Sequence, residues 1–339
     1  MMRLPWFQFH APTSVAEAAR ILAGEGPRGM LIAGGTDLLP NMKRRQQTPA
    51  TLISLSRVEG LKKIANGSGL ALGAGLTLTG VVNAQAVREQ YRGLWQAAAQ
   101  VASPQLRNMG TLGGNLCLDT RCNYYNRNED WRRAIDFCMK KDGKVCWVAT
   151  ASKRCLAVSS TDTAPALIAL GAKVRLVSAA GERELALVSL YNNDGINYLT
   201  RKADEILTEV LLPEADGWKS TYWKLRRRGS FDFPLLGVAL AARAAPDGTI
   251  EEALLVLGAV SSHPLVTKAG EFLAGKKLTD EVIAEAGTMA ASRAKPMDNT
   301  DLDVYWRKEV VPDFVGYALR EIRGDDMRAL RMRIARQAL

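Results

Sequence analysis

The chain has few histidines and no long uninterrupted hydrophobic run. Its 339 residues include two histidines, His10 and His263, so acid–base catalysis by imidazole has few candidate residues. No segment approaches the 18 consecutive apolar residues of a membrane span. The amino end also lacks the apolar core of a secretory signal. We therefore expect a cytoplasmic protein that is not inserted in a membrane.

Cysteine is scarce, and its distribution is uneven. Of five cysteines, four lie between residues 122 and 155, at Cys122, Cys138, Cys146 and Cys155. An odd number at low density disfavours structural disulfides and favours metal binding or redox chemistry. The four are separated by fifteen, seven and eight residues. This spacing contains no C-x-x-C pair, which disfavours a zinc ribbon or a dithiol motif. Four thiolates suit an iron–sulfur cluster, and scattered structural cysteines are the alternative.

Acidic residues do not balance the positive charge, and much of the imbalance is local. The net charge is +10, and residues 121–155 carry nine basic and four acidic side chains, an excess of five. A positive charge concentrated beside the cysteines argues against a general nucleic-acid surface. These charges either act on whatever the cysteines bind or solvate an exposed segment. A basic nucleic-acid protein with a zinc-bound insert is the alternative from a different functional class.

Neither a spaced G-x-G-x-x-G nor a G-x-x-x-x-G-K-[ST] motif is present, but two loops contain adjacent glycines. The first lies in "LIAGGTDLLP" (31–40), after a predicted strand, and the second is "GTLGGN" (110–115). Adjacent glycines let backbone amides approach a phosphate closely. The two loops together could hold a pyrophosphate, although each could instead be a structural connection. The candidate binding residues are Ile32, Ala33, Gly34, Gly35, Thr36, Asp37, Leu38, Gly110, Thr111, Gly113, Gly114 and Asn115.

Two charged residues outside the glycine loops are further candidates. Asp162 precedes a predicted helix, where it either caps the helix or accepts hydrogen bonds from a ribose or ribityl hydroxyl. Lys224, in "YWKLRRRGSFDFP", either stabilises negative charge on a flavin or is an ordinary strand lysine.

The order of predicted elements indicates an α+β or α/β protein with three units. Residues 1–57 alternate helices and strands in the manner of parallel βα units. Residues 58–217 form a second unit, which contains the cysteine-rich segment at about 117–157 as an insertion. Residues 218–339 show three strands followed by helices, which predicts a three-stranded sheet with helices on one face.

In order and combination, these motifs resemble the flavin-binding medium subunits of the molybdenum hydroxylases, the group that contains xanthine and carbon monoxide dehydrogenases. The resemblance rests on "AGGTD" (33–37), "GAGLT" ending at Thr77, "TLGGN" (111–115), "TDTAPALIALGA" (from Thr161) and "KLRRRGSFD" (224–232). It covers essentially the whole chain. It implies a two-subdomain FAD-binding unit in which the two glycine loops hold the FAD pyrophosphate, followed by a carboxyl-terminal domain on the isoalloxazine side.

The insertion sets this chain apart from most of that family. One branch, the β subunits of the 4-hydroxybenzoyl-CoA reductases, carries a similar insertion with the wording "CNYYN", "WRRAIDFCMKKDG" and "KRC". This resemblance implies that Cys122, Cys138, Cys146 and Cys155 bind an additional [4Fe-4S] cluster. We expect Cys117 to pack near the flavin, although an exchange of roles with Cys122 is the alternative.

The resemblance also implies an electron-transfer subunit whose catalytic molybdenum lies on a partner. The assembly would contain a large molybdopterin subunit and a small subunit with [2Fe-2S] clusters, and this heterotrimer would be duplicated. Electrons would run from reduced ferredoxin through [4Fe-4S] and FAD to molybdenum, where 4-hydroxybenzoyl-CoA is reduced to benzoyl-CoA. A hydroxylase or aldehyde dehydrogenase that passes electrons outward is the alternative.

Overall fold

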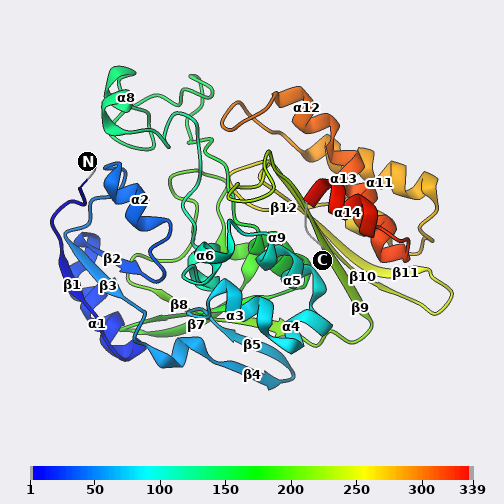
Figure 1. Ribbon diagram of the computed structural model, residues 1–339, viewed down its shortest axis with the longest axis horizontal. Coiled ribbons are helices and arrows are strands. Elements are labelled where there is room, and N and C mark those ends of the chain that lie inside the picture. Colours follow the sequence, from blue (N-terminus) through cyan, green and yellow to red (C-terminus); the bar gives the residue numbers. More distant parts are fainter. Residues whose placement is uncertain (1–2, 336–339) are drawn as a thin grey trace.

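The computed structural model describes residues 3–335, and the chain forms three sheets arranged in sequence order (Figure 1). The first sheet is parallel, with strand order β1-β3-β2, as the alternating βα pattern predicts. Ser14 caps helix α1, and Ala18, Ala19 and Leu22 on one face of the helix are buried. The elements are β1 (Gln8–His10), α1 (Val15–Glu25), β2 (Gly29–Ile32), α2 (Leu38–Lys43) and β3 (Thr51–Ser54).

The second sheet has five antiparallel strands in the order β4-β5-β8-β6-β7. Short consecutive helices follow the second strand of this sheet, and one of them, α5, packs against β9 of the third sheet. The strands are β4 (Ile64–Gly67), β5 (Gly69–Gly73), β6 (Lys173–Ser178), β7 (Gly181–Ala186) and β8 (Ile206–Pro213). The helices are α3 (Leu78–Asn83), α4 (Gln85–Gln90), α5 (Arg92–Ala99), α6 (Pro104–Arg107), α7 (Leu112–Leu116) and α9 (Thr163–Ala169).

The third sheet is antiparallel, and a short fourth strand adds to the three that the sequence predicts. Side chains alternate along β10, so Ala239 and Ala241 face the second unit while Val238 and Leu240 face the carboxyl-terminal helices. Helices therefore cover both faces, because α5 and α9 cover the face opposite α11 and α13. The elements are β9 (Trp218–Leu225), β10 (Leu236–Ala244), β11 (Ile250–Gly258), β12 (Leu265–Thr267), α10 (Ala269–Leu273), α11 (Asp280–Arg293), α12 (Val304–Glu309), α13 (Val311–Arg323) and α14 (Arg328–Ala335).

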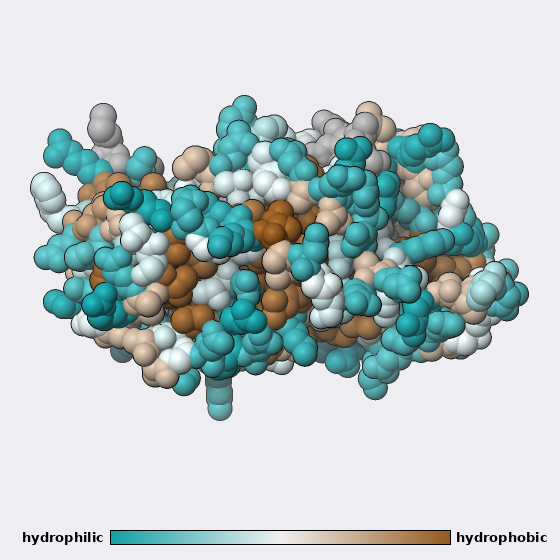
Figure 2. Space-filling view, turned by 90° about the horizontal axis from the view of Figure 1, so that it is seen from below, coloured by the Kyte–Doolittle hydropathy of each residue, from teal (hydrophilic) through white to brown (hydrophobic). Residues whose placement is uncertain are grey.

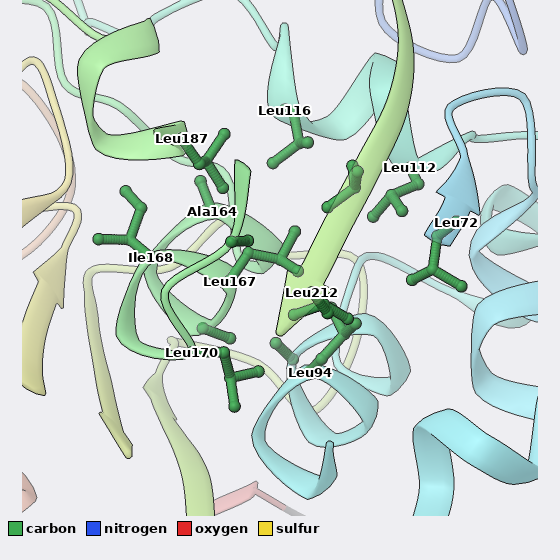
Figure 3. Packing of buried hydrophobic residues seen from close by; sticks show 14 of the residues in the cluster. Leu72, Leu94, Leu112, Leu116, Ala164, Leu167, Ile168, Leu170, Leu187 and Leu212 are labelled. Atoms are coloured by element: carbon green, nitrogen blue, oxygen red, sulfur yellow. The ribbon is translucent and has the colours of Figure 1, made fainter. Parts of the chain in front are cut away.

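The largest hydrophobic core joins the second and third units. Figure 3 shows Leu167 of α9 beside Leu212 of β8, and Ile168 of α9 and Leu94 of α5 belong to the same buried cluster. Leu112, from the second glycine loop region, is buried in the same cluster. Because that loop is anchored in the main core, its backbone is held in a fixed place relative to the sheets.

The cysteine-rich insertion projects from the body of the protein above α2 (Figure 1). Its regular secondary structure, in the part of the chain that is described, is the short helix α8 (Glu129–Ala134), capped by Asn128. Backbone hydrogen bonds between Arg121 and Val158, of 2.8 and 2.7 Å, close its base. The remaining chain is irregular, with positive φ at Asp136 and Phe137.

On the face turned away from the insertion, hydrophilic side chains surround smaller hydrophobic patches (Figure 2). No helix within residues 3–335 has the length and hydrophobicity needed to span a membrane.

Candidate functional site

The first glycine loop connects Ile32, the last residue of β2, to Leu38, the first residue of α2. Gly35 has φ of +70°, a conformation that glycine adopts without strain. Gly34 lies against the second loop, since a Cβ atom there would be 1.8 Å from the carbonyl oxygen of Met109. The close approach of the two backbones explains why glycine is required at Gly34.

Several backbone amides in this loop have no backbone partner. Within the described chain, the N–H groups of Ala33, Gly34, Gly35 and Thr36 donate to no backbone carbonyl. These residues are half-buried, so their amides are open to solvent or to a ligand with several acceptor oxygens. The loop is therefore suited to hold a phosphate.

The second glycine loop forms a short helix, α7, rather than the expected loop. Thr111 caps it by accepting a hydrogen bond from the Gly114 amide at 3.1 Å. The Gly113 amide donates to the Ala74 carbonyl at 2.8 Å, so this amide supports the fold. A Cβ atom at Gly114 would meet only the Thr111 hydroxyl within 4 Å, at 2.9 Å. Space beside Gly114 is thus available for a ligand.

Thr77 and Gly110 hold the second loop in position. The Thr77 hydroxyl accepts a hydrogen bond from the Gly80 amide at 3.0 Å and so caps α3. Thr77 also forms an isolated β-bridge with Thr111. The Leu78 amide donates to the Gly110 carbonyl at 2.8 Å. Thr77 and Gly110 therefore both make structural contacts with the protein at the second glycine loop.

Asn115 links the second loop to the segment before α9. Its Oδ1 atom accepts hydrogen bonds from the hydroxyls of Thr161 and Thr163 at 2.8 and 2.6 Å. The neighbouring Ser160 is 3% exposed, and its hydroxyl has no hydrogen-bond partner within the described residues. A buried hydroxyl without a partner adds a second indication that a polar ligand binds here.

Asp162 and Lys224 form a buried ion pair with a separation of 2.9 Å. The Asp162 carboxylate also accepts a hydrogen bond from Tyr222 at 2.8 Å, and the Lys224 ammonium donates to the Gln100 carbonyl at 3.0 Å. Burial raises the pKa of Asp162, an effect that Lys224 opposes. Burial lowers the pKa of Lys224, which Asp162 opposes in turn. Asp162 makes no side-chain cap on α9, and its partners are Lys224 and Tyr222.

Arg226 lies close to this pair, and Arg107 is a neighbour of Arg226. The Arg226 side chain donates to the Gln100 carbonyl at 3.4 Å, and Arg107 donates to the Val101 carbonyl at 2.8 Å. The positive charge of Arg226 acts on Asp162, Lys224 and Arg107 alike. Asp232 also acts on Lys224, so the ion pair lies among charges of both signs.

The four cysteines of the insertion surround one cavity. Cys122, Cys138, Cys146 and Cys155 line it, together with Tyr124, Tyr125, Met139, Lys140, Trp147, Val148 and Ala157. Each of the four thiols belongs to a buried residue, and all five cysteines of the chain are free of disulfides. Cys117 does not line the cavity and packs against the main hydrophobic core instead. The structure therefore places Cys122, rather than Cys117, with the other three.

Burial makes two of these thiols, those of Cys122 and Cys155, hard to ionise without a cation. It raises the pKa of Cys122 to about 12 and that of Cys155 to about 11, with Lys140 lowering the latter. The Lys140 ammonium is paired with Asp119 at 2.7 Å. Among residues 3–335, no three Cys, His, Asp or Glu side chains are arranged to hold a single metal ion. A group with several metal atoms, each bound by a different thiolate, remains compatible with the donor set.

Sequence reasoning missed three residues of this region: Ser160, Lys140 and Arg121. Arg121 forms a salt bridge with Asp37 of the first loop, and its guanidinium lies 4.5 Å from the Phe233 ring centroid. Burial lowers the pKa of Arg121 to about 10. Each of the three was visible only as one polar residue among many, because its significance depends on partners distant in the sequence.

Family models match both parts of the chain. The "FAD binding domain in molybdopterin dehydrogenase" model matches residues 5–215, and the "CO dehydrogenase flavoprotein C-terminal domain" model matches residues 220–322. The aldehyde oxidoreductase FAD-binding subunit of Escherichia coli is 33% identical, over 87% of this chain and 92% of its own. The nicotinate dehydrogenase FAD-subunit of Eubacterium barkeri is 28% identical, over 90% and 92%.

A solved structure shows the same arrangement of elements. Carbon monoxide dehydrogenase from Hydrogenophaga pseudoflava matches with a TM-score of 0.78 and 26% identity, over 95% of this chain and 99% of the other. The predicted fold class is thereby confirmed. The family models, the relatives and the shared fold agree, and the chain belongs to the FAD-binding medium subunits of the molybdenum hydroxylase family of oxidoreductases.

Proposed function

We propose that this chain holds FAD with its two glycine loops and transfers electrons to or from a molybdenum-containing partner subunit. FAD, when bound, supplies reversible uptake of electrons. The free amides of residues 33–36 and the space beside Gly114 suit the pyrophosphate. The Ser160 hydroxyl offers a further polar contact. Asp162 and Lys224 act indirectly in this proposal, since each is occupied by the other.

Replacing Gly114 with leucine is expected to eject FAD while the flavin-free protein remains folded. In the absence of ligand, the Cβ atom of the added side chain meets only the Thr111 hydroxyl within 4 Å. In the FAD complex it would occupy the ligand's space. FAD content by absorbance and circular dichroism of the flavin-free protein measure the two effects. Full FAD retention would show that the second loop is only structural.

We further propose that the cysteine cavity binds a [4Fe-4S] cluster. The observation that carries this proposal is the convergence of four buried thiols on one cavity inside a single inserted segment. The cluster would supply one-electron transfer. Thiolates form readily only when metal replaces their protons, which agrees with the raised pKa values of Cys122 and Cys155.

Replacing Cys138 with serine is expected to reduce the iron content of the purified chain by up to about four atoms. With FAD supplied in excess, the flavin content should stay near that of the natural chain. Iron analysis and low-temperature electron paramagnetic resonance of the reduced protein measure the result. Cys117→Ser is the matched control, because Cys117 lies outside the cavity. Unchanged iron in Cys138→Ser would remove this residue from the ligand set.

We also propose that the assembled enzyme is a 4-hydroxybenzoyl-CoA reductase. It would combine this chain with a large molybdopterin subunit and a small [2Fe-2S] subunit, as a duplicated heterotrimer that receives electrons from ferredoxin. The inserted cysteines and the exposed basic residues of the insertion support this reading, since a ferredoxin is acidic; these residues are Arg127, Arg133, Lys144, Lys153 and Arg154. Turnover of 4-hydroxybenzoyl-CoA by the purified complex with reduced ferredoxin is the test.

A second candidate is a related enzyme that runs oxidatively. The 33% identity to an aldehyde oxidoreductase FAD-binding subunit favours it. Oxidation of aldehydes by the same complex, with no turnover of the thioester, would establish this alternative. Because the partner subunit selects the substrate in either case, the assay requires the whole complex.

A further inference from the structure

The insertion is attached to the amino-terminal end of helix α2, directly after the first glycine loop. Asp37 precedes the helix, and its carboxylate is paired with the Arg121 guanidinium. The side chain of Arg121 is 11% exposed, and its guanidinium also lies over the ring of Phe233 in the third unit. Arg121 therefore contacts the flavin loop and the carboxyl-terminal domain, and it is followed immediately by Cys122.

The insertion also holds the other end of α2. Arg44 follows the helix, and its carbonyl accepts a hydrogen bond from Arg132 of α8 at 2.8 Å. The side chain of Gln46 donates to the carbonyl of Tyr125. Both Arg132 and Gln46 are buried. Figure 1 shows α8 above α2, in agreement with these contacts. The inserted segment therefore contacts both ends of helix α2.

The order of that segment depends on its cysteine cavity. Three of the thiols, Cys122, Cys138 and Cys155, form the insertion's own buried cluster together with Tyr125 and Ala157. The six residues of α8 are its regular structure in the described chain. A segment with so small a hydrophobic core is stabilised strongly by a group that cross-links its cysteines. Filling the cavity should therefore fix the residues that hold α2.

We propose that the cysteine cavity and the first glycine loop are thermodynamically coupled, with Arg121 as the positioning residue between them. This inference rests on the proposed function. Filling the cavity fixes Arg121 against Asp37, which holds the loop in the conformation that binds FAD. Because coupling is reciprocal, bound FAD also stabilises the filled cavity. Arg121 has no catalytic role in this proposal.

The test is FAD affinity of the full-length chain, measured by flavin fluorescence with and without its iron. Iron is removed by chelation and restored by reconstitution, and iron analysis checks each sample. In the natural chain, iron removal should weaken FAD binding about fivefold or more, the usual range of coupling between sites. In Arg121→Gln, binding should be weak with or without iron. Arg121→Lys retains the charge and should recover part of the coupling.

Arg133→Gln is the matched control, because Arg133 is an exposed arginine of the same insertion that pairs only with Glu129. In Arg133→Gln, iron removal should weaken FAD binding as much as it does in the natural chain. Equal FAD affinity of the iron-loaded and iron-free natural chain would overturn the coupling alone. Full coupling in Arg121→Gln would overturn the role of Arg121. A natural chain that takes up no iron would overturn the proposed cluster, and the coupling with it.

Discussion

Replacing Gly34 with alanine is expected to remove FAD from the purified protein and to destabilise its fold. The new Cβ atom would lie 1.8 Å from the Met109 carbonyl oxygen and 2.5 Å from its carbonyl carbon. Neither atom can rotate away, because both belong to the backbone, so the two glycine loops must separate. Overpacking of this kind costs about 3 kcal/mol, the upper end of the usual range. FAD absorbance and thermal unfolding measure the two effects.

Gly60→Ala provides the control for that experiment. A Cβ atom at Gly60 would have no neighbour within 4 Å, and its φ is not positive. Gly60→Ala should therefore retain FAD and its melting temperature. If Gly34→Ala also retained both, the contact between the two loops would not be needed for FAD binding. Gly114→Leu complements the pair, since it should lose FAD without the loss of stability.

Replacing Lys224 with methionine is expected to destabilise the protein by about 3–5 kcal/mol, the usual effect of leaving one partner of a buried ion pair alone. The side chains of Lys224 and Asp162 are 0% and 3% exposed, so no solvent replaces the lost ammonium. Because the pair joins β9 to the segment before α9, the third unit should also dock less firmly. Chemical denaturation measures the change in unfolding free energy.

The loss of stability in Lys224→Met should also depend on pH. Burial raises the pKa of Asp162, and Lys224 lowers it, so the variant's carboxyl has a still higher pKa. A group whose pKa is raised on folding stabilises the folded state below its unfolded pKa, about 4 for aspartate, and less as pH rises. The deficit of Lys224→Met relative to the natural chain should therefore grow as pH rises from about 4.

Two controls separate the buried charge from other effects. Lys62→Met removes one partner of the exposed Lys62–Glu59 pair and should change stability little. Combining Asp162→Asn with Lys224→Met removes both charges and should recover much of the stability. A full loss in the double variant would mean that packing, rather than the unpaired carboxylate, accounts for the effect.

The fold followed from local patterns that act over short distances. Alternating helices and strands predicted the parallel first sheet, and the strand-rich region after residue 218 predicted the third. The short strand β12 was missed because three residues carry too weak a periodic signal. The second glycine segment was expected to be a loop, but hydrogen bonds from Leu112 to Leu76 and from Gly113 to Ala74 support a short helix there.

Only part of the candidate site could be predicted, because only that part is encoded by residues close together in the sequence. Glycine loops and clustered cysteines are recognisable because their chemistry resides in adjacent or nearby residues. Asp162 and Lys224 were considered separately as ligand contacts, since nothing in the sequence indicates that residues 62 positions apart form an ion pair. Arg121 was counted only as one of the nine basic residues beside the cysteines, and Ser160 was not considered, because a single arginine or serine carries no pattern.

The sequence by itself determined the glycine loops, the inserted group of four thiols and the succession of α/β units, because each is encoded by residue type and local spacing. Only the tertiary structure decided which groups meet. It placed Cys122 rather than Cys117 at the cavity, paired Asp162 with Lys224, and set the insertion against both ends of α2. Burial is the physical reason, because a charge or thiol removed from water must find its partner wherever the packed chain brings one close.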